Sequence, residues 1–91
     1  MAARARTRPA PAAEPPTVAL GRAIRARRRE LGLTQAALAR FAGCGLAFLY
    51  ELESGKATVR LDKLLAVLQV LGMTLRLEPG REPLSIRAAK P

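Results

Sequence analysis

The sequence contains no histidine and no tryptophan, and Cys44 is its single cysteine. A lone cysteine excludes an intrachain disulfide framework and a zinc site built from cysteines. The absence of histidine removes the usual general base and the commonest zinc ligand. No apolar run approaches the length that a membrane-spanning helix needs, so the sequence predicts no membrane-spanning segment.

Side chains with catalytic potential are few and poorly placed. Glu51 and Glu53 are two residues apart, so a helix points them in different directions. Tyr50 and Cys44 have no evident neighbouring base that could activate them as nucleophiles. The sequence therefore predicts that the protein is not an enzyme, with no catalytic residues, no cofactor and no metal.

Acidic residues are scarce as well. Only 7 Asp and Glu stand against 16 Lys and Arg in 91 residues, which gives a net charge of +9 and a pI near 11.5. A strongly basic small chain points to a polyanionic partner. Two alternatives stay open: a solvated basic surface without a partner, and an anionic membrane surface, which would need a basic amphipathic helix with bulky apolar residues on the opposite face.

The two ends of the chain differ in composition from its middle. Residues 1–16 are mostly Ala, Pro and Arg, which predicts a disordered basic arm, either an inert tail or a segment that contacts phosphates. The arm lacks the apolar segment of a secretory signal, and its prolines oppose the amphipathic helix of a transit peptide. We therefore expect a cytoplasmic protein, with a folded domain over residues 17–78 and a flexible tail over residues 79–91.

The segment QAALARFAGCGLAFLYELESGK, which begins at Gln35, carries the strongest motif. Gln35, Ala39, Gly43, Leu49 and Leu52 fall at positions 1, 5, 9, 15 and 18 of it. This spacing predicts two helices that cross at a tight turn, the helix-turn-helix, whose second helix is built to lie in the DNA major groove. The small Ala39 permits close approach, and Gly43 can take the left-handed conformation that ends a helix. The alternative is a plain antiparallel helical hairpin.

The hydrophobic pattern predicts four helices in all. Thr17 is expected to cap the first helix, and Gly32 to end it; its apolar stripe is Leu20, Ile24 and Leu31. Thr34 is expected to cap the second helix, which runs to about residue 42. The third helix is predicted to begin at residue 45 or 46 and to end before Gly55.

The fourth helix is predicted from about Arg60 to Leu71, with Gly72 as its end. Its predicted core stripe follows the helical spacing i, i+3, i+4, i+7 and is continued by Leu71: Leu61, Leu64, Leu65 and Leu68. Val67 and Val70 lie off that stripe and widen the apolar face.

After Gly72 the period changes to an alternation. The apolar residues Met73, Leu75 and Leu77 alternate with polar ones, which predicts a short β-strand. A lone strand leaves both edges unpaired, so the expected partner is the same strand in a second copy, giving a homodimer with twofold symmetry. The alternative is an extended tail that lies across the core.

The segments LGRAIRARRRELGLTQAALARFAG, LYELESGK and RLDKLLAVLQVLGMTLRLEP resemble the phage-repressor-like (Xre/Cro-type) helix-turn-helix family from Leu20 to Leu71. Within that family, GLAFLYELESGK, RLDKLLAVLQVLG and MTLRLEP are most similar to HipB-type antitoxins. The resemblance implies an all-α, four-helix phage-repressor-like domain whose short C-terminal β-strand pairs across a dimer. It also implies a repressor of its own operon that binds double-stranded DNA as a homodimer and binds a HipA-like kinase toxin.

The resemblance also assigns roles to single residues. Gln35 matches a residue that contacts a phosphate, and Lys56 lies where the loop after the third helix meets the DNA backbone. Arg60 is also expected to bind DNA. Arg28 and Glu53 match a pair that forms a partly buried salt bridge. Periodicity alone does not separate Arg28 from Arg27, since both border the apolar stripe.

The start of the third helix is where the family pattern weakens. Gly45, Leu46 and Ala47 stand where the family usually carries polar or basic residues, and none of them can make a bidentate hydrogen bond to a base edge. Leu46 and Ala47 could touch thymine methyls, and Tyr50 could donate to a phosphate or a base. Gly45, Leu46, Ala47 and Tyr50 are therefore expected to face DNA that is held mainly through its phosphates, with little base-specific reading. The alternative function is a protein-interaction module of the same fold that no longer reads DNA sequence.

Overall fold

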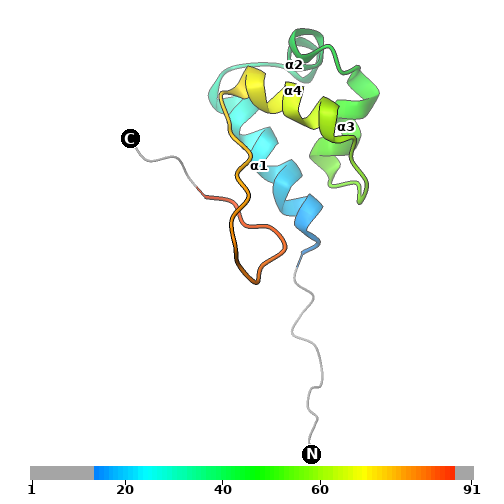
Figure 1. Cartoon of the computed structure of the whole chain (residues 1–91). Helices are drawn as coiled ribbons and strands as arrows, with labels where there is room; N and C mark the ends of the chain where they lie inside the picture. Colours follow the sequence, from blue (N-terminus) through cyan, green and yellow to red (C-terminus); the bar gives the residue numbers. More distant parts are fainter. Residues whose placement is uncertain (1–13, 88–91) are drawn as a thin grey trace, which may run out of the picture.

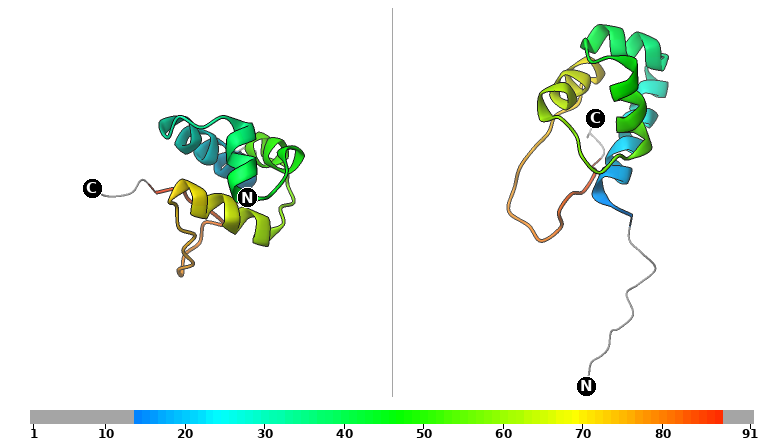
Figure 2. Two further views of the ribbon diagram at one scale, coloured as in Figure 1. Left: turned by 90° about the horizontal axis from the view of Figure 1, so that it is seen from above. Right: turned by 90° about the vertical axis from the view of Figure 1, so that its right-hand side faces the viewer.

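The computed structural model describes residues 14–87, which fold as four helices (Figure 1): α1 Pro16–Glu30, α2 Gln35–Ala42, α3 Leu46–Ser54 and α4 Leu61–Leu71. Both α1 and α2 pack against α3 and α4. The segment after α4 leaves the group of helices as an open loop (Figure 2). The predicted all-α, four-helix class is confirmed.

In the described part of the chain, no helix has the length and apolar character needed to cross a membrane. Residues 1–13 of the predicted arm and 88–91 of the predicted tail lie outside the described residues.

The predicted capping of α1 by Thr17 is wrong. The helix is preceded by Pro15, and Pro16 occupies its first position, where a proline's missing N–H would have had no partner in any case. Thr17 lies inside the first turn, and its hydroxyl donates a 3.0 Å hydrogen bond to the carbonyl of Gly55 at the end of α3. Thr17 therefore fixes the contact between two helices rather than the start of one.

The ends of α2 follow the sequence prediction. The hydroxyl of Thr34 accepts a 3.0 Å hydrogen bond from the N–H of Ala37, which caps the helix. Gly43 ends α2 with φ 67° and ψ 28°, a left-handed conformation that glycine adopts without a steric cost. Because α3 begins at Leu46, only the short segment 43–45 separates the two helices.

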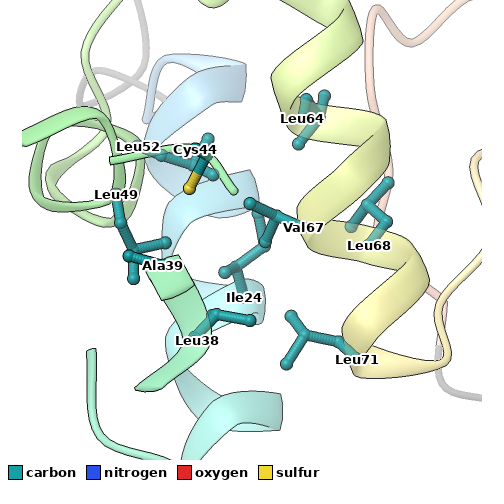
Figure 3. Packing of buried hydrophobic residues seen from close by; sticks show 10 residues of the cluster. All are labelled: Ile24, Leu38, Ala39, Cys44, Leu49, Leu52, Leu64, Val67, Leu68 and Leu71. Carbon is teal, nitrogen blue, oxygen red and sulfur yellow. The ribbon is translucent and has the colours of Figure 1, made fainter. Parts of the chain in front are cut away.

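The core lies where the four helices meet (Figure 3). One fully buried side chain from each helix stands near its centre: Ile24, Leu38, Leu49 and Val67. Six further buried residues complete the cluster: Ala39, Cys44, Leu52, Leu64, Leu68 and Leu71. Every helix therefore contributes to a single core, and α3 is positioned by that core.

Some apolar residues predicted for the core are exposed. Leu61 and Leu65 are 57% and 45% exposed, whereas Val67 is fully buried. The buried face of α4 is Leu64, Val67, Leu68 and Leu71. That set has the same i, i+3, i+4, i+7 spacing as the predicted stripe, shifted by three residues, so periodicity cannot choose between the two and packing against α1 and α2 decides. Leu31 is also exposed, because α1 ends at Glu30.

The segment after α4 starts on the core and then departs from it. Met73 packs against the core, and its N–H donates to the carbonyl of Leu68 at 2.9 Å. Leu75 and Leu77 are exposed, Leu77 to 92%. Residues 14–87 contain no strand, so the strand of Met73, Leu75 and Leu77 and the homodimer built on it stay predictions.

Gly21 sets the close approach of α1 to α3. A Cβ atom added at this position would lie 2.7 Å from the carbonyl oxygen of Glu53 and would clash with that of Leu52 as well. A glycine inside a helix costs about 1 kcal/mol relative to alanine. Here the missing side chain is what lets the two backbones touch.

A buried ion pair joins α1 to the end of α3. The side chains of Arg28 and Glu53 are 10% and 4% exposed. Arg28 donates to Glu53 from Nε at 2.7 Å and from Nη2 at 3.0 Å, and its Nη1 donates to the carbonyl of Leu33 at 2.9 Å. Gln35 adds a 3.0 Å bond from Nε2 to the same carboxylate. Hydrogen bonding to Glu53 raises the pKa of Arg28, so the guanidinium stays charged.

The neighbouring Arg27 ties α1 to α4. Its Nε donates a 2.9 Å hydrogen bond to the carbonyl of Leu71, in the last turn of α4, where helix carbonyls have no partner within the helix. Its Nη1 lies 3.2 Å from Glu30. Two consecutive arginines of α1 thus bind the ends of two different helices.

We expect Arg28→Ala and Glu53→Ala each to lower the free energy of unfolding by about 3 kcal/mol, because the remaining charge stays buried without its partner. The double variant should cost less than the sum of the two, as a double-mutant cycle in urea would show. The exposed pair of Lys56 and Glu51 serves as the matched control, and its cycle should give a coupling near zero. Equal couplings in the two cycles would contradict the structural role of the buried pair.

We also expect Gly21→Ala to destabilise the protein by about 1–3 kcal/mol, because the added methyl group must push α3 away from α1. Intrinsic helix propensity alone predicts the opposite sign. The matched control is Ala26→Gly, at an exposed position of the same helix, which should cost about 1 kcal/mol through propensity only. A higher melting temperature for Gly21→Ala would show that the backbones do not touch.

Candidate nucleic-acid interface

The exposed side chains in the first turn of α3 are apolar, where a recognition helix is usually polar. Leu46 is 38% exposed, Ala47 is exposed beside it, and Tyr50 one turn later is 51% exposed. The helix begins after Gly45 without a side-chain cap, so the first N–H groups of α3 have no partner within the helix. The donors at this end of α3 are therefore backbone N–H groups rather than side chains.

An open hollow of about 280 Å³ lies between α1 and α3. Its lining combines three arginines with residues of α2 and α3: Arg25, Arg28, Arg29, Gln35, Tyr50, Glu53 and Ser54. The structure thus brings the predicted contacts Gln35 and Tyr50 together with the ion pair. Gln35 donates one of its two amide hydrogens to Glu53, and its second amide hydrogen can still donate to another group.

A second open hollow, of about 410 Å³, lies between α3, the loop after it and the start of α4. It is lined by Phe48, Glu51, Leu52, Lys56, Thr58, Val59, Arg60 and Lys63. The structure thus groups Lys56 and Arg60, the two predicted DNA contacts that follow α3. The α3 residues of the first hollow and those of the second lie on opposite faces of the helix, so α3 stands between the two hollows.

Two of the three cations of the second hollow are held by weak, exposed ion pairs. Lys56 Nζ lies 3.1 Å from Glu51 Oε1, and Arg60 donates to both carboxylate oxygens of Asp62 at 3.2 and 2.7 Å. Hydrogen bonding from Arg60 lowers the pKa of Asp62. Exposed pairs of this kind contribute little to stability, so Lys56 and Arg60 can exchange these partners for phosphates at low cost.

Three basic residues of the hollows were not among the predicted contacts: Arg25, Arg29 and Lys63. Arg25 and Arg29 are four residues apart on α1, and Arg25 lies three residues before Arg28, so helical spacing places all three on neighbouring positions of one face. The nitrogen of Lys63 lies 5.5 Å from the ring centre of Phe48. The spacing of these arginines is present in the sequence, but it indicates a basic face toward α3 only once Arg28 is known to contact Glu53 of α3.

The chemistry of this surface suits a polyanion. Cations line both flanks of α3, while the first turn of the helix presents apolar side chains and backbone donors. Residues 14–87 hold no group of three or more carboxylate, cysteine or histidine side chains that could bind a metal ion. The arrangement can neutralise phosphates on both sides of a helix, and it offers little for reading bases.

Comparison with known proteins agrees with this fold. Residues 19–79, which span most of α1 and all of α2 to α4, match the model of a family described as a helix-turn-helix domain. The chain is 45% identical over 62 residues to the uncharacterized HTH-type transcriptional regulator y4mF of Sinorhizobium fredii (strain NBRC 101917 / NGR234), covering 67% of this chain and 82% of that protein. A solved structure described as MDT Protein matches with a TM-score of 0.64 at 25% identity, over 71% of this chain and 92% of that one. On its sequence and its fold, and in line with the Xre/Cro-type resemblance, the chain belongs to the helix-turn-helix domain family.

Proposed function

We propose that the protein is a DNA-binding transcriptional repressor that holds the duplex mainly through its phosphates. The observation that carries this proposal is the placement of α3 between two hollows lined by cations. A helix in the major groove has a phosphate backbone on each side, which is where the two hollows lie. The likeness to a protein named as a transcriptional regulator supports the same function.

The residues on α3 explain why phosphates dominate. Leu46 and Ala47 carry no hydrogen-bonding side-chain atoms, so they offer only apolar contacts such as a thymine methyl group. Tyr50 and Glu51 are the exposed polar side chains of the helix centre, and Glu51 is engaged by Lys56. Because the net charge of +9 acts on any sequence, affinity for non-specific DNA is high in this account.

The repressor would act as a homodimer. Within residues 74–87, no backbone group makes a hydrogen bond to another backbone group, and Leu77 is 92% exposed. Unpaired donors next to exposed apolar side chains are the features of an open strand edge. Pairing of residues 73–77 with the same segment of a second copy would satisfy the donors and present two α3 helices to one face of DNA.

The resemblance to HipB-type antitoxins extends the proposal to a kinase toxin. In that reading the protein represses its own operon and also binds a HipA-like kinase. The segments GLAFLYELESGK and RLDKLLAVLQVLG, which carry the resemblance, form α3 and α4. A kinase-like gene directly beside this one would favour the antitoxin over a stand-alone repressor.

A second function is favoured by one observation. Phe41, in the last turn of α2, is 59% exposed, and Leu46, in the first turn of α3, is 38% exposed, so apolar side chains flank the turn between these helices. A protein partner could cover them. In that case the chain would be an interaction module with the helix-turn-helix fold and no DNA-reading role.

The first functional test is a titration of promoter DNA and a scrambled duplex at several salt concentrations. We expect steep loss of affinity with salt for both duplexes, because counterions are released from each neutralised phosphate. Lys56→Ala should weaken binding to both duplexes about equally and reduce the salt slope by about one unit. Leu46→Ala should affect only the promoter duplex, if at all. Absence of binding to either duplex at low salt would favour the interaction module.

The second functional test removes the predicted strand. Truncation after Met73 keeps the core contact and the hydrogen bond of that residue to Leu68 but deletes residues 74–91. We expect sedimentation to show a monomer, because the pairing segment is gone. The matched control is truncation after Pro79, which removes only the predicted tail and should stay dimeric. Identical dimers from both truncations would rule out pairing through this segment.

A further inference from the structure

We propose that Arg25 and Arg29 of α1, together with the hydroxyl of Tyr50, bind a phosphate of the DNA backbone on the side of α3 opposite to Lys56. This inference rests on the proposed function, because it names where a second DNA strand would be held. Its new element is Arg25 and Arg29, to which neither the family resemblance nor the helix-turn-helix spacing gives a role.

The charges in the first hollow are unbalanced. Its lining contains three guanidinium groups and one carboxylate. Arg28 uses Nε, Nη1 and Nη2 on Glu53 and Leu33, and Glu53 also accepts from Gln35. The acid is therefore fully engaged within the protein, and it leaves the charges of Arg25 and Arg29 without compensation inside the hollow.

The guanidinium groups of Arg25 and Arg29 are available to donate hydrogen bonds to an anion. Both are exposed, and neither makes an ion pair or a side-chain hydrogen bond within residues 14–87. Lys56 and Arg60, by contrast, must first leave Glu51 and Asp62. Guanidinium groups bind phosphate through paired N–H donors, and two of them four residues apart on one helix face can reach the same anion.

Tyr50 completes the hollow from α3. Its side chain is 51% exposed and lines the hollow with the arginines. The hydroxyl of Ser54 already donates to the carbonyl of Glu51 at 2.9 Å, so Tyr50 is the hydroxyl donor of α3 that remains for an anion. The phenol thereby connects the recognition helix to the basic face of α1.

The first experiment measures the salt dependence of duplex binding for Arg25→Ala and Arg29→Ala. Each should weaken binding roughly tenfold, as expected for a lost hydrogen bond to a charged group, and each should reduce the salt slope by about one unit. The matched control is Arg22→Ala, which removes the same charge from the same helix but lies outside both hollows and pairs with Glu14. It should leave the salt slope unchanged.

The second experiment uses Tyr50 as a probe. It is the only tyrosine, and the chain has no tryptophan, so intrinsic emission reports on this hollow alone. Titration of the full chain with inorganic phosphate should quench the emission in a saturable way, whereas chloride at equal ionic strength should not. The Arg25→Ala/Arg29→Ala variant should lose saturation and show only collisional quenching, while its melting curve stays that of the wild type.

The outcomes separate the two ideas. If Lys56→Ala reduces the salt slope but Arg25→Ala and Arg29→Ala behave like Arg22→Ala, this inference is overturned and the proposed function stands. Non-saturable phosphate quenching in the wild type overturns the inference as well. If the wild type binds no duplex at low salt, the proposed function is wrong, and so is the assignment of Arg25, Arg29 and Tyr50 to a DNA phosphate.

Discussion

The buried ion pair between Arg28 and Glu53 is the interaction on which the rest of the structure depends. It joins α1 to the end of α3, and the bonds of the same two side chains to Leu33 and Gln35 add the first loop and the start of α2. Gly21 makes the pair possible, because the backbones of α1 and α3 touch at that residue. A charged pair taken out of water is a costly way to hold helices together, and it is retained here at the point where α3 needs a fixed orientation.

The orientation of α3 decides which of its side chains line the two hollows. With α3 fixed by its inner face, Tyr50 and Ser54 turn toward the basic face of α1, while Phe48 and Glu51 turn toward Lys56 and the start of α4. The helix that would enter a DNA groove is therefore flanked by cations and is itself poor in groups that read bases. In the proposed function, affinity and specificity are separated: the flanks would supply the affinity, and few residues would be available for the specificity.

The sequence predicted several parts of the fold that depend on local chemistry, although not the start of α1, which Pro15 and Pro16 set rather than Thr17. Thr34 and Gly43 have their predicted roles because caps and left-handed turns are decided by a few neighbouring residues. The sequence failed where a choice depends on what packs opposite. Leu61, which was predicted for the core stripe, is exposed, and Val67, which was predicted to lie off that stripe, is buried. Two apolar stripes of equal helical spacing lie on α4, and the sequence alone does not choose between them. Arg25 and Arg29 gave no signal alone, since exposed arginines of a basic helix look alike until the position of α3 is known.

The most direct measurement is a nuclear magnetic resonance titration of the isotope-labelled full chain with a short duplex at low salt, followed through its backbone amide signals. If α3 lies between two phosphate-binding flanks, the largest shifts occur together near Arg25, Arg29 and Gln35 on one side and near Lys56 and Arg60 on the other. A scrambled duplex gives the same pattern. Shifts confined to the apolar residues Phe41 and Leu46, or to one flank only, would contradict this account.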